Sequence, residues 1–159
     1  NKYKDLDQIE LFNTLKEYCN DHEIKVVPKN ISGGNLGQAG KLSDGSYKIW
    51  LDVNLGQEER NHVFLHEIAH QRLGHNEYAS ILSLSECEIQ AETFAYLSCK
   101  DFGIDTDKMS KSYVSNYFKD KDLDELCDEF DDVFKLRKEI FEYVKEKEKL
   151  KNLEHEHVK

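Results

Sequence analysis

The pattern of apolar residues along this sequence predicts an α+β fold. Three observations support that class: a helical stripe near the N-terminus, a group of short strand-like runs before residue 53, and several helical stripes after it. Strands and helices that are segregated along the chain, and do not alternate, indicate a small sheet packed against helices.

We expect this sheet to be three-stranded and mostly antiparallel. Apolar residues at a spacing of three to four predict an amphipathic helix over residues 5–20. A strand-like run follows at 23–28. The dipeptide Asp44-Gly45 is a hairpin signal, and it predicts antiparallel strands over 36–43 and 46–52.

Four helices are predicted after the sheet. The first begins near Gln57, with two acidic residues in its first turn, and ends at about Leu73. The second covers 84–101. A shorter helix is expected over 107–118 and a long one over 121–150, with a highly charged final segment that we expect to fray.

The composition excludes several classes of protein. The chain has 22 basic and 32 acidic residues, a formal net charge of −10. Nucleic acid binding needs a basic face, so we expect this domain not to bind nucleic acid directly. No apolar run reaches the roughly 18 residues of a membrane span. The four cysteines are widely spaced without a C-x-x-C pair, which predicts reduced, mostly buried thiols in a cytoplasmic protein.

Residues 66–70 read His-Glu-Ile-Ala-His, the pattern H-E-x-x-H. Helical residues four apart share a face, so His66 and His70 can bind one metal ion from successive turns. Glu67 would lie beside a water on that metal, whose pKa zinc lowers to about 7. The motif therefore predicts a Zn²⁺ site with His66 and His70 as ligands and Glu67 as the catalytic base. The alternative is a helix with two hydrogen-bonded histidines and a surface Glu67.

A third protein ligand is expected, because catalytic zinc usually has three. Glu88 and Glu92 are four residues apart on one face of the next predicted helix. We assign Glu88 to the metal and Glu92 to the second nitrogen of a ligand histidine; an exposed acidic face is the alternative. Glu86 is the second choice of ligand. His75 is a weaker one, because the pattern H-E-x-x-H-x-x-G-x-x-H would place the third histidine at Asn76.

These motifs can be compared with known families. The residues concerned are His66-Glu67-Ile68-Ala69-His70, Leu73-Gly74-His75 and Glu88-x-x-Ala91-Glu92-x-Phe94-Ala95. They resemble the ImmA/IrrE metallopeptidase family over about residues 36–100. The sequence departs from the family pattern at Gln90 and Glu92, but not at Glu88. Segments 91–96 and 102–106 are similar to the zincin domains of ArdC-like and LtrC-like proteins of conjugative mobile elements.

The resemblance implies a zincin-like fold, in which the small sheet packs on the motif helix. It implies a cytosolic, zinc-dependent metallo-endopeptidase that cuts a specific protein, for example a DNA-binding repressor of a mobile element. The alternative is a catalytically silent binding module of an antirestriction or regulatory protein. We expect an extended substrate to pair with strand 36–43 or 47–52. One tyrosine would assist the oxyanion, and the candidates are Tyr78, Tyr96 and Tyr113.

The 159 residues have the length of a single domain, 1–159. We expect the N-terminal helix and sheet in 1–56, the metal-site helices in 57–103 and the C-terminal helices in 104–150. The first residue is Asn1 and not Met, as expected of a trimmed chain or a domain excised from a longer protein.

Overall fold

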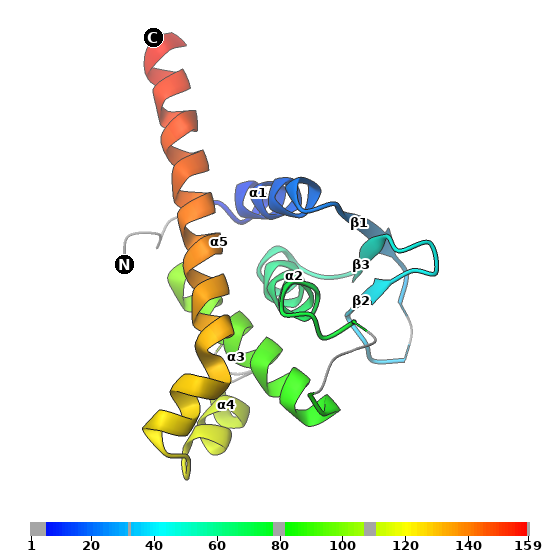
Figure 1. Cartoon of the computed structure of the whole chain (residues 1–159). Coiled ribbons are helices and arrows are strands. Elements are labelled where there is room, and N and C mark those ends of the chain that lie inside the picture. Colours follow the sequence, from blue (N-terminus) through cyan, green and yellow to red (C-terminus); the bar gives the residue numbers. More distant parts are fainter. Residues whose placement is uncertain (1–5, 32, 78–81, 107–110, 159) are drawn as a thin grey trace.

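The computed structural model describes residues 6–31, 33–77, 82–106 and 111–158 (Figure 1). Within these residues, five helices and three strands follow one another as α1, β1, β2, β3, α2, α3, α4 and α5. This order confirms the predicted α+β class.

Helix α1 (Gln8–Asp21) begins where the sequence supplies a cap. The Asp7 carboxylate accepts hydrogen bonds from the backbone amides of Ile9 and Glu10, at 2.8 and 3.2 Å. These bonds satisfy amide groups that have no partner inside the helix. One face of α1 then buries its apolar residues in the core, among them Leu15 and Tyr18.

The sheet consists of β1 (Ile24–Lys29), β2 (Gly37–Lys41) and β3 (Tyr47–Asp52), in the order β1-β3-β2. β2 and β3 form the predicted antiparallel hairpin, whose turn has Gly45 at a φ of +87°. β1, however, pairs with β3 in parallel. The prediction of a mostly antiparallel sheet was therefore wrong for one of the two pairings, and the sheet is mixed.

Helix α2 (Gln57–Arg72) is the centre of the fold. It contacts α1, β2, β3, α3 (Leu84–Asp101) and α5 (Leu123–Val158), as Figure 1 shows. Its apolar side chains Phe64, Leu65 and Ile68 are fully buried. The Gln71 side-chain amide donates to the backbone carbonyls of Gly40 on β2 and Lys48 on β3, at 3.0 and 2.8 Å. These contacts fix the end of α2 against the sheet.

Two further helices complete the described chain. Helix α4 (Lys111–Phe118) covers the second part of the predicted helix 107–118, and residues 107–110 lie outside the described residues. Helix α5 crosses the body, and its C-terminal end extends past α1 into open space (Figure 1). It continues to Val158, so the predicted end near residue 150 was wrong. The charged tail contains acidic and basic residues three or four positions apart, such as Glu148 and Lys151, and such pairs favour a helix even without a core.

Polar contacts attach α5 to the other helices. The Arg137 guanidinium donates to both carboxylate oxygens of Asp101 on α3, at 2.7 Å each. Arg72 donates to the hydroxyl of Tyr18 at 2.9 Å, and that hydroxyl donates to Glu139 on α5. Among the described helices, none is both long and apolar enough to cross a bilayer.

Candidate metal centre

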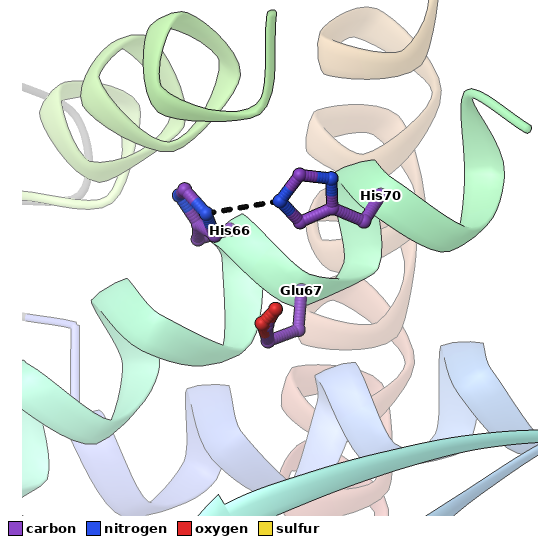
Figure 2. A group of neighbouring side chains, drawn as sticks. All are labelled: His66, Glu67 and His70. Carbon is purple, nitrogen blue, oxygen red and sulfur yellow. Dashed lines mark hydrogen bonds between the residues drawn. The ribbon is translucent and has the colours of Figure 1, made fainter. Parts of the chain in front are cut away.

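Two imidazole rings lie side by side on α2. His66 and His70 occupy successive turns, and their Nε2 atoms face each other at 3.1 Å (Figure 2). The ring centroids are 4.8 Å apart and the rings are nearly perpendicular. Two ring nitrogens at this distance repel each other unless a proton or a cation lies between them. The helix therefore presents two nitrogen atoms whose lone pairs can bind one positive ion.

Glu88 reaches the same point from α3. Its two carboxylate oxygens lie 3.5 Å from Nε2 of His66 and 3.1 Å from Nε2 of His70. The structure thus brings together the three residues that the sequence suggested as ligands. Zinc bonds of about 2.0–2.1 Å at tetrahedral angles would separate two ligand atoms by about 3.3 Å. The observed separations fit a Zn²⁺ ion held by His66, His70 and Glu88.

The outer ring nitrogens have partners of different kinds. Nδ1 of His66 lies 2.9 Å from a carboxylate oxygen of Glu92, and the other oxygen of Glu92 lies 3.6 Å from Nε2 of His62. Nδ1 of His70 lies 3.0 Å from Nδ1 of His75. Both rings are therefore oriented by contacts at Nδ1, and their Nε2 atoms point to the proposed metal position.

The local charges favour a cation at this centre. Burial disfavours the charged form of His66, but the carboxylates of Glu88 and Glu92 outweigh it and raise the pKa of His66 to about 10. Polar contacts with the rings of His66 and His70 hold the pKa of Glu88 well below its usual range. The carboxylate of Glu88 is thus ionised at neutral pH and available to a metal.

Glu67 is the buried acid of the site, with 6% of its surface exposed. A carboxylate oxygen of Glu67 and one nitrogen from each of His66 and His70 all lie within 4.8 Å of one another. Burial raises the pKa of Glu67 above its ordinary value, which increases its affinity for a proton. Gly37 on β2 leaves room for it: a Cβ at Gly37 would lie 3.1 Å from Cγ of Glu67 and 2.7 Å from Cγ1 of Val63.

A continuous cleft passes over this centre, between β2 and α3. Glu67, His70 and Glu88 line both of its arms. The remaining walls of one arm include Leu36, Glu59, His62, Val63 and Glu92, and those of the other include Gln38, Ala39, Trp50, Leu84 and Cys87. The first arm therefore contains two carboxylates, those of Glu59 and Glu92, that the second arm lacks.

The other candidates from the sequence lie elsewhere. Glu86 forms a capping box with Ser83 at the start of α3, which occupies its carboxylate. His75 lies behind His70, on the side away from Nε2. Tyr96 and Tyr113 do not line the cleft, and Tyr78 lies outside the described residues.

Sequence reasoning missed two residues near the metal centre, His62 and Gln90. His62 precedes His66 by four positions, and this helical spacing could have placed it on the same face. Gln90 contacts His75, with its Oε1 2.7 Å from Nε2 of that ring. Nothing in the local sequence indicates this contact, because it joins α3 to the turn after α2.

Comparison with known proteins identifies a family for this chain. A family model described as the IrrE N-terminal-like domain of the M78 peptidases matches residues 19–143. The uncharacterized protein pXO2-81 of Bacillus anthracis is 29% identical over 87 residues, which are 54% of this chain and 15% of that relative. The chain thus spans less than a sixth of the relative's length. No solved structure matches significantly. Since the family match covers most of the chain and includes the whole metal centre, this chain belongs to the IrrE N-terminal-like family of M78 peptidases.

Proposed function

We propose that this domain is a zinc-dependent metallo-endopeptidase of the ImmA/IrrE type. One observation carries the proposal: His66, His70 and Glu88 converge at the spacing of zinc ligands, with the buried carboxylate of Glu67 beside them in an open cleft. A structural zinc site is normally closed by four protein ligands, whereas a catalytic one keeps a position free. The three convergent ligands correspond to the second type.

Each residue has a distinct task in this mechanism. Zinc held by His66, His70 and Glu88 would supply Lewis acidity to a water and to the scissile carbonyl. Glu67 accepts the proton of the attacking water at its carboxylate and then delivers it to the nitrogen of the leaving amine. The burial of Glu67 supports this role, because a raised pKa lets the carboxylate hold the proton between the two steps.

The substrate is proposed to bind as an extended segment along β2. β3 is the central strand, so both of its edges are already paired and strand 47–52 cannot accept a further strand. β2 is an edge strand, and its residues 37–39 line the cleft. Addition of a peptide strand to β2 would place its backbone next to Glu67 and the metal ligands.

The substrate itself is proposed to be one specific protein of the cytoplasm, such as a DNA-binding repressor encoded on the same mobile element. The similarity of segments 91–96 and 102–106 to ArdC-like and LtrC-like proteins supports this setting. A general protein such as casein is therefore a poor test substrate.

The test compares the wild-type domain with Glu67→Gln, which keeps size and polarity but removes the base. We expect unchanged zinc content and fold, and a loss of cleavage of at least about 100-fold against a regulator encoded beside this protein. Fragments that appear equally with both proteins would come from a contaminating protease. A zinc-loaded wild type that cleaves none of the neighbouring proteins would favour the catalytically silent binding module.

A further inference from the structure

A chain of hydrogen-bonding groups leads from the metal centre to the backbone of α5. It starts at Nδ1 of His70, which lies 3.0 Å from Nδ1 of His75. Nε2 of His75 lies 2.7 Å from Oε1 of Gln90, and the amide nitrogen of Gln90 donates to the backbone carbonyl of Glu129 at 3.0 Å. Gln90 is buried, with 7% of its surface exposed, so its amide needs both partners.

The backbone carbonyl of Glu129, at the end of this series, determines the direction of every hydrogen bond in it. A backbone carbonyl can only accept, so the NH₂ group of Gln90 faces Glu129 and its oxygen faces His75. That oxygen also only accepts, so Nε2 of His75 carries a hydrogen. A neutral His75 then offers the lone pair of Nδ1 to His70.

We propose that His75 and Gln90 are positioning residues that keep the ring hydrogen of His70 on Nδ1 and leave its Nε2 free to bind the metal. The requirements of the metal, at the other end of this hydrogen-bonded series, lead to the same arrangement independently. A metal at Nε2 of His70 needs the lone pair there, which requires the hydrogen on Nδ1 and an acceptor facing it. This inference rests on the metal site of the proposed function.

The turn after α2 brings His75 to this position. Gly74 has a φ of +74°, in the left-handed region that favours glycine, and the backbone amide of His75 bonds back to the carbonyl of His70 at 3.0 Å. The rings of His70 and His75 then meet edge to face at an interplanar angle of 66°, with centroids 5.1 Å apart. His75 therefore acts through His70, and its own Nδ1 does not point to the metal position.

The two histidine ligands are thus supported in different ways. His66 has the carboxylate of Glu92 beside its Nδ1, whereas His70 has the imidazole of His75 and, beyond it, the amide of Gln90. Loss of either support should affect one ligand and leave the other in place. This selectivity separates a positioning role from a general effect on folding.

The first experiment determines the ring tautomers by nitrogen-15 NMR of the metal-free protein. We expect the wild type to carry the hydrogen of His70 on Nδ1 and that of His75 on Nε2. Gln90→Leu and His75→Phe should change the His70 signals and leave those of His66 unchanged, while Glu92→Gln should do the opposite. A wild type with the His70 hydrogen on Nε2 would overturn the inference.

The second experiment measures zinc affinity by chelator competition, with urea unfolding as the check on folding. His75→Phe and Gln90→Leu should weaken zinc binding about 10- to 100-fold. His75→Asn can place an amide oxygen where Nδ1 was, so its affinity should stay within about 3-fold of wild type. Folded His75→Phe and Gln90→Leu proteins that bind zinc as tightly as wild type would contradict the proposal.

The proposed function and this inference fail in different ways. If the wild-type protein does not bind zinc, the proposed function is wrong, while the tautomer measurement still tests the hydrogen-bonded series from His70 to Glu129. If the wild type binds zinc but has no peptidase activity, only the proposed reaction is wrong. If His75→Phe and Gln90→Leu bind zinc with normal affinity, only the proposed roles of His75 and Gln90 are wrong.

Discussion

Two glutamates that are two residues apart on α3 have different environments. The Glu86 side chain accepts a hydrogen bond from the backbone amide of Ser83, whereas Glu88 faces the two histidine rings. Residues two apart point about 200° apart around a helix of 3.6 residues per turn. The helix therefore gives one acid to its own cap and the other to the metal centre.

This difference predicts opposite results for two matched variants. Glu88→Ala should lose zinc to a mild chelator, because it removes a ligand. Glu86→Ala should keep its zinc and lose only about 1 kcal/mol of stability with the capping box. Metal analysis after dialysis against the chelator, together with urea unfolding, checks both. Zinc loss in Glu86→Ala alone would show that Glu86, and not Glu88, is the metal ligand.

His66 predicts a pH dependence of the metal-free protein. Its pKa of about 10 in the fold lies above the ordinary value of 6.5. A group with a raised pKa in the folded state stabilises that state fully below its unfolded pKa. The contribution of His66 is therefore present at pH 6, and is lost as the pH rises from about 6.5 toward 10.

The measurement is urea unfolding in the presence of a chelator between pH 6 and 9. The wild type should lose stability across this range, and His66→Gln should show a smaller decline. The tyrosines and lysines have little effect on the comparison, because they are present in both proteins. Equal slopes for the two proteins would contradict the pKa assigned to His66.

At the scale of elements, the close approach of β2 and α2 depends on one glycine. A Cβ at Gly37 would lie 2.7 Å from Cγ1 of Val63, and the stiff valine side chain cannot easily move away. Gly40, on the same strand, would place its Cβ 3.4 Å from the Trp50 ring, an ordinary contact. Substitution of Gly40 is therefore a matched control for substitution of Gly37.

We expect Gly37→Ala to destabilise the protein by about 1–3 kcal/mol and to reduce activity by displacing Glu67. Gly40→Ala should change both quantities little. The double variant Gly37→Ala/Val63→Ala relieves the clash and should recover part of the lost stability. Thermal unfolding and cleavage of the protein substrate measure these effects. Equal losses in the two single variants would show that space near Glu67 is not the cause.

Much of the fold follows from local sequence, and the exceptions have a common origin. The start of α2 could be predicted from the two acidic residues of its first turn, and the ends of α2 and α3 from Gly74 and Gly103, because these signals are local. The parallel pairing of β1 with β3 could not, because it depends on how the chain crosses between 30 and 36. Strand periodicity shows which residues are buried, but not which strand lies beside which.

The candidate site divides in the same way. The spacing in 66–70 places two histidines on one helix face, so the sequence could suggest His66, Glu67 and His70 directly. Glu88 needed the added assumption that α3 packs on α2. The contact between His75 and Gln90 was beyond prediction, because it joins two helices through a turn whose path is set by Gly74.

At the scale of the whole molecule, α5 consists of two parts with different neighbours. Up to Val144 it buries Phe130, Val133, Ile140 and Val144 in the core. Farther on, Lys147 lies 3.8 Å from Glu17 of α1, and both Leu150 and Leu153 are about half exposed. The last turns therefore contribute little to the packing of the body.

Truncation separates these two parts. A chain that ends after Glu148 should keep its zinc affinity and lose no more than about 0.5 kcal/mol of stability. A chain that ends after Lys138 loses Glu139, Ile140 and Val144, and should not unfold cooperatively. Circular dichroism during heating distinguishes the two. Unfolding of the longer chain would show that the final turns contribute to the core.

The ligands of the metal centre come from two helices, and this has a consequence for the energetics of the whole chain. His70 and Glu88 are separated by a connection that includes residues 73–83, and a shared ion would tie its two ends together as a disulfide does. Zinc is then a reversible cross-link, and a chelator acts on the protein as a mild denaturant. At a free zinc concentration of 100 times Kd, the folded state gains about 2.7 kcal/mol, which chelation should remove as a lower melting temperature. Glu88→Ala, which lacks one anchor of the cross-link, should melt at nearly the same temperature with and without zinc.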